Sequence, residues 1–340
     1  MSDRDAVEPW NDLYLRAALS GSRPGSSLDA RSSPDIIPCT AAVDPSSFAT
    51  AADYACLHPA AGLRHRQTGF VYVRAANAAA SAVAPKAEAT LFKTSSSLVC
   101  FPGDDDWTML FDTGRNNRIA LQPRPLPAGA VAVTAAPFVY AQDDEEIPCF
   151  VSWLSTGNHP QPSPPPRLYN LGGVARFLAA SPNYVCHNVA LAPPAMGQAR
   201  FNRPFRVGDT AARVVFGLEL INCAGFRVSM TAARALPDGR RVQLEPTVVP
   251  GDDAFRCRMG PFAVPAHWGT DFDVAYDPSG SAPVDFSINL ICEYVIDERS
   301  EPSLWPVARP LSGLIGTDKA GLKAFRSVVV GSVGVMRSSS

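Results

Sequence analysis

The sequence lacks the short motifs by which many enzymes are recognised. It has no G-x-S-x-G elbow, Walker loop, G-x-G-x-x-G turn or H-E-x-x-H helix, which excludes the hydrolase, nucleotide-binding and metalloprotease classes that depend on them. The five histidines are scattered without metal-ligand spacing, and Cys186 and His187, being adjacent on a strand, would point to opposite faces. We therefore expect a protein that is not an enzyme and has no cofactor.

The chain also lacks any C-x-x-C pair, which argues against a zinc ribbon or a thioredoxin-like site. Its eight cysteines occur singly, most of them in apolar runs, where buried thiols behave as small hydrophobic groups. We expect reduced core thiols, with one or two disulfides or a reactive thiol as the alternatives. The cysteines are Cys39, Cys56, Cys100, Cys149, Cys186, Cys223, Cys257 and Cys292.

An excess of positive charge and long apolar runs are missing as well. The net charge is −2 and there are only four lysines, so nucleic acid is not an expected partner. The apolar stretches at 127–141 and 327–336 are too short or too interrupted by proline to span a bilayer. The acidic N-terminus shows no secretion signal. These features predict a cytoplasmic protein or a component of an assembled particle.

What the sequence has in abundance is short β-like segments. Its 32 prolines and 24 glycines leave little room for long helices, and runs such as "FVYVRAAN" and "VDFSINLICEYVIDE" alternate or are rich in β-branched residues. With 340 residues, two cores are expected. The prediction is an all-β chain of two tandem antiparallel β-sandwiches, Ig-like or jelly-roll-like, with an extended N-terminal arm and a short C-terminal tail.

Changes in composition suggest where these parts begin and end. We expect an arm over 1–45, a first sandwich over 46–157, a proline-rich linker over 158–168, a second sandwich over 169–302 and a docking tail over 303–340. A final strand is an equal interpretation of the tail. Within these parts, short helices are expected at 10–19, 171–182 and 318–325, and "LPDGRR" predicts a hairpin turn at 236–241.

Two groups of side chains are candidates for binding. Asp104, Asp105 and Asp106 could bind calcium in a loop, although consecutive acids more often form a solvated turn. Four tryptophans in loop-like positions could line a protein-interaction surface, or could instead plug the ends of a β core. They are Trp107, Trp153, Trp268 and Trp305.

The order of several motifs over residues 10–190 resembles a bacterial Ig-like β-sandwich module of the CARDB type. The matching elements are "SPDI" at 33–36, "VYVR" at 71–74 with Asn77, Cys149 in an apolar run, and residues 181–188. The chain departs from the pattern at Cys186 and His187, where a tryptophan is expected, and at 78–80, where alanines replace a glycine. The resemblance implies a spacer, adhesive unit or assembly part without catalytic residues.

The leading functional hypothesis is a non-catalytic structural or interaction protein that works in a larger assembly with itself or with other proteins. Arms, tails and strand edges would make the contacts. A viral or phage capsid or tail jelly-roll protein is a second hypothesis, although the nearly neutral arm disfavours contact with a packaged genome. A lectin-like carbohydrate- or calcium-binding module is a third, and an enzyme without a recognisable motif a fourth.

Overall fold

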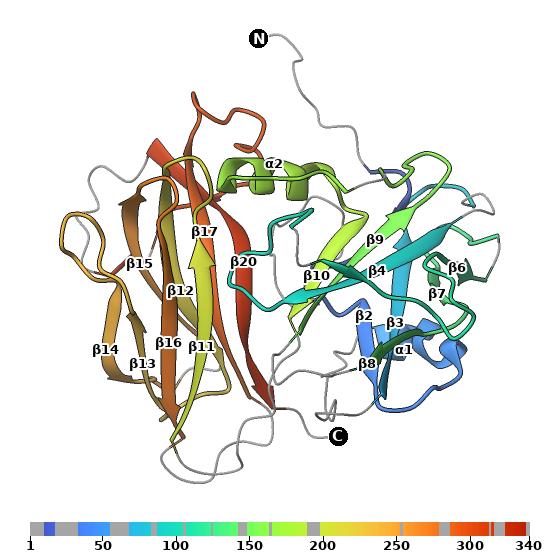
Figure 1. The fold of residues 1–340 in the computed structure, drawn as a ribbon, viewed down its shortest axis with the longest axis horizontal. Helices are drawn as coiled ribbons and strands as arrows, with labels where there is room; N and C mark the ends of the chain where they lie inside the picture. The colour runs from blue at the N-terminus through green and yellow to red at the C-terminus, as the bar shows by residue number, and fades with distance from the viewer. Residues whose placement is uncertain are drawn as a thin grey trace.

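The computed structural model describes residues 10–17, 33–54, 68–82, 87–104, 107–123, 125–141, 148–162, 165–188, 198–251, 254–278, 286–312, 314–315 and 324–337. Two β-sandwiches lie side by side, with the helix α2 (Leu171–Ala180) across the top of the junction in the view of Figure 1. The prediction of an all-β chain is confirmed.

The first sandwich is one branched antiparallel sheet folded around an apolar core. Its central path runs β1-β3-β7-β6-β4-β9-β10, while β2 and β8 pair with β3 and β5 pairs with β4. A 3₁₀ turn at Pro45–Ala49 and the short helix α1 (Ala51–Tyr54) follow β2. The strands are β1 (Leu13–Tyr14), β2 (Ile36–Cys39), β3 (Thr68–Asn77), β4 (Glu88–Ser95), β5 (Thr108–Met109), β6 (Ile119–Gln122), β7 (Val131–Thr134), β8 (Phe138–Ala141), β9 (Pro148–Ser155) and β10 (Tyr184–Asn188).

Part of the segment expected as an arm belongs to this sheet. Strand β1 pairs with the end of β3, and β2 pairs with its first half, so the sheet begins well before residue 46. The helix expected over 10–19 is wrong for the described residues, because Leu13 and Tyr14 form a strand. The alternation in "FVYVRAAN" places one set of side chains in the core, and the β3 backbone has partners on both sides.

A buried carboxylate pins these early strands to β3. Asp35 is fully buried and accepts a 2.6 Å hydrogen bond from the Arg16 guanidinium and a 3.1 Å bond from Arg74 Nε. Arg74 also pairs with Asp53 at 2.6 Å, and the Arg16 guanidinium lies 3.3 Å from the Tyr54 ring centroid. Because buried charges are costly unless they are paired, this network holds residues 16 and 35 in place.

The second sandwich consists of a four-stranded sheet in the order β11-β16-β13-β14 and a six-stranded sheet in the order β18-β20-β17-β12-β15-β19. The predicted hairpin at 236–241 is confirmed, since β13 and β14 pair across it and Gly239 takes a left-handed φ of 82°. The strands are β11 (Ala199–Arg206), β12 (Ala212–Ile221), β13 (Arg227–Ala232), β14 (Gln243–Val248), β15 (Ala254–Val264), β16 (Gly269–Asp277), β17 (Phe286–Asp297), β18 (Arg309–Pro310), β19 (Leu314–Ile315) and β20 (Phe325–Arg337).

The strand pairing of this sandwich has the nested order of a jelly roll. Around the hairpin β13–β14 lie the pairs β12–β15 and β11–β16, and the outermost pair is β17–β20. Such nesting describes one long hairpin of eight strands wound over two sheets, which is the jelly-roll arrangement. Here the first strand of the hairpin is supplied by β20 from the end of the sequence, so the order of strands is that of a circularly permuted jelly roll.

The segment expected as a docking tail therefore completes the second sandwich. Strand β20 pairs with β17 along its whole length, which agrees with the alternative interpretation of a final strand. A buried ion pair joins it to its neighbours: Arg258 Nε donates to Glu293 at 2.9 Å, and Ser327 Oγ lies 3.1 Å from Arg258. The helix expected over 318–325 lies mainly outside the described residues.

Loop 96–104, which follows β4, binds the two sandwiches together. Leu98, Val99 and Phe101 belong to the core cluster of the second sandwich. The Leu98 amide donates a 2.9 Å bond to Pro204 O on the edge strand β11. Gly331 on β20 leaves room for the loop, because a Cβ there would lie 1.8 Å from Leu98 O. The proline-rich segment begins folded back on the first sandwich, where Thr90 Oγ1 lies 2.7 Å from Gln161.

Candidate functional site

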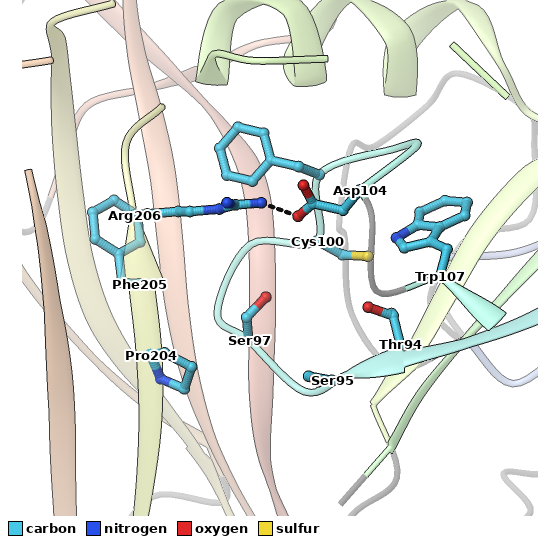
Figure 2. A pocket seen from close by; sticks show the side chains of 10 residues that line it. Thr94, Ser95, Ser97, Cys100, Asp104, Trp107, Pro204, Phe205 and Arg206 are labelled. Atoms are coloured by element: carbon cyan, nitrogen blue, oxygen red, sulfur yellow. Dashed lines mark hydrogen bonds and ion pairs between the residues drawn. The ribbon is translucent and has the colours of Figure 1, made fainter. Parts of the chain in front are cut away.

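A cavity of about 390 Å³ opens at the junction of the two sandwiches. One wall comes from the end of β4 and from loop 96–104, and the other from the end of β11 (Figure 2). A smaller cavity of about 210 Å³ adjoins it and shares Phe101, Asp104 and Arg206. The larger cavity is lined by Thr94, Ser95, Ser97, Cys100, Phe101, Asp104, Trp107, Pro204, Phe205 and Arg206.

Charge in this cavity is already paired across the junction. Asp104 from the first sandwich forms an ion pair with Arg206 from β11, and the Arg206 guanidinium lies 5.0 Å from the Phe101 ring centroid. Both charged side chains are solvent-exposed, so the pair contributes little to stability. Asp105 and Asp106, the other acids of the predicted calcium loop, lie outside the described residues.

Of the four tryptophans selected from the sequence, Trp107 is the one that lines this cavity. Its indole N–H is buried and has no hydrogen-bond partner among the described residues. Its ring lies 5.3 Å from Phe92 and stacks at 6.4 Å on Tyr184. A buried donor without a partner is costly, so this N–H destabilises the folded chain slightly.

The other three selected tryptophans are separate from the cavity. Trp153 is 3% exposed and packs edge to face on Tyr184 at 5.6 Å, and Trp268 is 2% exposed and donates to Ala235 O in the second sandwich. These two are core side chains, in line with the interpretation that they plug the β cores. Trp305 is half-buried under the Arg326 guanidinium, at 4.5 Å.

Cys100, which lines the cavity, packs in one small cluster with two further cysteines. Cys100 from the loop, Cys149 from β9 and Cys186 from β10 are all free. Cys186 Sγ also lies 3.5 Å from the Tyr184 hydroxyl. Donation by Cys100, and then by Cys149, holds the pKa of Cys186 well below its usual value. Figure 2 shows the thiol of Cys100 turned from the loop toward Trp107.

Sequence reasoning missed this cluster because its members are 37 or more residues apart in the chain. The available signal was the spacing on the strands: Cys149 lies opposite Asn188 in the β9–β10 pair, and Cys186 lies two residues before Asn188. Residues two apart share a face of a strand. Only the loop position of Cys100 gave no sequence clue.

His187 points to the opposite side of β10 from Cys186, as predicted for neighbours on a strand. It is 2% exposed, and its Nδ1 lies 2.7 Å from Ser33 O. Burial lowers the pKa of His187 to about 4. The imidazole is therefore neutral at pH 7 and acts as a structural hydrogen-bond donor to the segment before β2.

Within the part of the chain that the structure describes, no three His, Cys, Asp or Glu side chains are arranged to hold a metal ion. No helix there has the length and apolar character needed to cross a membrane. The lining of the junction cavity thus includes an exposed ion pair and one free thiol, that of Cys100. These groups suit binding or thiol chemistry.

No family model matches this chain, and no curated protein matches it. Among solved structures, the collagen-binding domain of Erysipelothrix rhusiopathiae surface protein RspB is 10% identical, covers 81% of this chain and 91% of its own, and has a TM-score of 0.17. Serine-rich repeat protein Srr2 from Streptococcus agalactiae is 6% identical, with coverage of 76% and 87% and a TM-score of 0.16. At these TM-scores neither structure identifies the function of this chain.

Proposed function

We propose that this chain is a non-catalytic structural subunit whose two sandwiches act as one rigid block and associate with further copies of the chain. The proposal rests on the core that the two sandwiches share at their junction. Loop 96–104 of the first sandwich contributes buried side chains to the core of the second. Two units that share a core cannot move independently, and a fixed geometry between units is what an assembling subunit requires.

A contact surface for such association lies at one end of the second sandwich. Ile221 at the end of β12 and Val248 at the end of β14 are 37% and 57% exposed. They lie at the same end, because Val248 pairs with Arg227 just after the turn that follows Ile221. Exposed aliphatic side chains gathered in this way favour protein contacts. We call these two residues the apolar end.

The jelly-roll order of the second sandwich supports a more specific form of the proposal. Viral shell proteins use this architecture, as lectin domains and cupins also do, so a capsid or tail subunit agrees with the strand order.

The test is the mass of the full chain in solution, measured by light scattering over a concentration series. We expect a discrete oligomer that dissociates in the double variant Ile221→Glu, Val248→Glu. Val43→Glu is the matched control, since Val43 is 42% exposed on the first sandwich, and this variant should keep the oligomer. Deleting 1–45 or 311–340 would not be informative, because the deletions remove strands of the sheets. A monomer at every concentration would refute self-assembly.

A polar groove supports a second candidate function, that of a carbohydrate-binding module. The groove, of about 410 Å³, lies on the outer face of β11, β13 and β16. Its floor includes the small side chains Ala233 and Ala275, and Arg200, Asp271 and Asp273 stand around it. Such a site could hydrogen-bond to sugar hydroxyls. Binding on a glycan array that is lost in Asp271→Ala, without loss of fold, would support this candidate.

A further inference from the structure

The three thiols at the junction cavity have no role in the function proposed above. Cys149 and Cys186 belong to neighbouring strands and pack in one small core cluster, against which Cys100 also packs. Each of the three thiols shifts the pKa of the other two, so their side chains lie within interaction distance. Three free thiols in one packed cluster have the reactants for a disulfide already in place.

The register of the strands determines which two of the three cysteines can form a disulfide. In the β9–β10 ladder Cys149 lies opposite Asn188, and Cys186 lies opposite Val151, so the two strand cysteines are diagonal neighbours. Diagonal Cα atoms are about 7–8 Å apart, beyond the separation that a disulfide spans without backbone movement. Cys100 is on a loop, outside the fixed register of the ladder, and its side chain interacts with both of the others. Every favourable disulfide of the cluster therefore includes Cys100.

Cys100 is also the member of the cluster that a reagent can reach. Cys100 and Cys186 are half-buried and Cys149 is fully buried, but of the three only Cys100 lines the cavity of about 390 Å³. The exposed Asp104–Arg206 pair stands at the same cavity. A small molecule that enters the cavity thus meets Cys100 first.

We propose that this cluster is a thiol–disulfide exchange site, in which a small-molecule disulfide oxidises Cys100 and cross-links it to Cys149 or Cys186. In the first step Cys100 Sγ attacks one sulfur of the reagent. The reagent's S–S bond breaks, and one half leaves as a thiol with the proton of Cys100. In the second step a strand thiol loses its proton and attacks Cys100 Sγ, and the other half of the reagent leaves as a thiol. Two protein thiols are oxidised and one disulfide is reduced to two thiols.

The surroundings of the cluster favour the second step. Thiolates are the nucleophiles in such exchange. The pKa of Cys186 is lowered by its interactions with Cys100 and then Cys149, and its contact with the Tyr184 hydroxyl lowers it further. Cys186 is therefore the strand thiol that loses its proton most readily and attacks Cys100 Sγ.

Oxidation would have a structural consequence at the junction. Loop 96–104 contributes Leu98, Val99 and Phe101 to the core of the second sandwich, while Cys100 between them packs on the first. A disulfide from Cys100 to the β9–β10 wall would convert this packing contact into a covalent link. The two sandwiches would then be coupled through a bond that reductants can remove.

The experiment treats the reduced full chain with oxidised glutathione, then alkylates the remaining thiols after denaturation and maps the peptides by mass spectrometry without reduction. We expect the loss of two alkylatable thiols and a cross-linked peptide pair that joins Cys100 to Cys149 or Cys186. Cys257→Ala, which removes a buried thiol of the second sandwich, is the control and should react like the wild type. Cys100→Ala should show at least a tenfold lower yield of any cross-link.

A second variant keeps Cys100 in place and so does not depend on the folding of Cys100→Ala. In the double variant Cys149→Ala, Cys186→Ala, the reaction should stop after the first step, with glutathione retained on Cys100. The proposal is overturned if the treated wild type keeps all its thiols, if glutathione is found only on cysteines outside the cluster, or if Cys100→Ala forms a cluster disulfide at the wild-type yield.

Discussion

Replacement of Gly331 by alanine tests whether the two sandwiches depend on each other for stability. A Cβ at this position of β20 would lie 1.8 Å from Leu98 O and 3.0 Å from Val99 Cα. Ordinary contact needs at least about 3.4 Å, so the loop backbone must retreat by about 1.5 Å. This movement partly withdraws Leu98 and Val99, which are 1% and 2% exposed, from the second core.

The cost can be estimated from these contacts. Overpacking of a core costs about 1–3 kcal/mol, and each fully buried aliphatic side chain contributes about 1.5–3 kcal/mol. Partial exposure of two such side chains brings the expected loss for Gly331→Ala to about 2–4 kcal/mol. Urea unfolding followed by tryptophan fluorescence measures it, since Trp107 lies beside the loop. Alkylation of Cys100 in the native state should also become faster, because its loop has moved.

Two matched variants separate this effect from general damage. A Cβ on Gly157 would have nothing within 4 Å, so Gly157→Ala should unfold like the wild type. A Cβ on Gly334, also on β20, would lie 2.1 Å from Ile288 O within the same sandwich. Gly334→Ala should therefore destabilise the protein without faster alkylation of Cys100. Wild-type stability and wild-type alkylation in Gly331→Ala would refute the account of a shared core.

Three further variants test individual features of the fold. Asp35→Asn should cost about 3–5 kcal/mol in urea unfolding, because it leaves the buried guanidiniums of Arg16 and Arg74 without their shared carboxylate; a loss below 1 kcal/mol would contradict this. The folded pKa of His187 is about 4, below its unfolded value, so stability should fall by up to about 3 kcal/mol as the pH drops from 6.5 to 4, and His187→Gln should remove that component of the slope. Gly239→Ala has room for its Cβ but is strained at φ 82°, so it should cost about 1–2 kcal/mol, and an unchanged denaturation midpoint would be inconsistent with the turn.

The strands could be predicted because their signals are local. Alternation along residues 70–77 and the Pro-Asp-Gly turn depend only on near neighbours, and both predictions match the structure. The role of residues 33–36 could not be predicted in this way. Polar composition around them suggested an arm, but Asp35 is fixed by two arginines from other segments, and such long-range pairing leaves no periodic pattern.

The candidate site was predictable only in part for the same reason. Trp107 and Asp104 were selected from the sequence, and both line the junction cavity. Arg206, which pairs with Asp104, comes from the second sandwich, and Cys100 comes from an irregular loop. No rule of sequence spacing connects either residue to Asp104 or Trp107. The sequence left open whether the second sandwich is Ig-like or jelly-roll-like, because the strand that begins the winding, β20, comes last in the chain.

The strand edges of the second sandwich show where the first sandwich covers it and where it is free to contact other chains. An open edge invites pairing with other chains. The outer edge of β11 receives loop 96–104 and carries Pro204. Strand β20 pairs with the short strand β18 at one end and is met further along by Asn188 from β10, whose amide donates to Ser332 O at 2.6 Å. Both edges on the side of the junction are thus covered. Strand β14 lies on the far side of the second sandwich from the first (Figure 1) and ends at Val248 in the apolar end. Association through that end would leave the junction cavity accessible, so the proposed oxidation of Cys100 could stiffen a subunit that is already assembled.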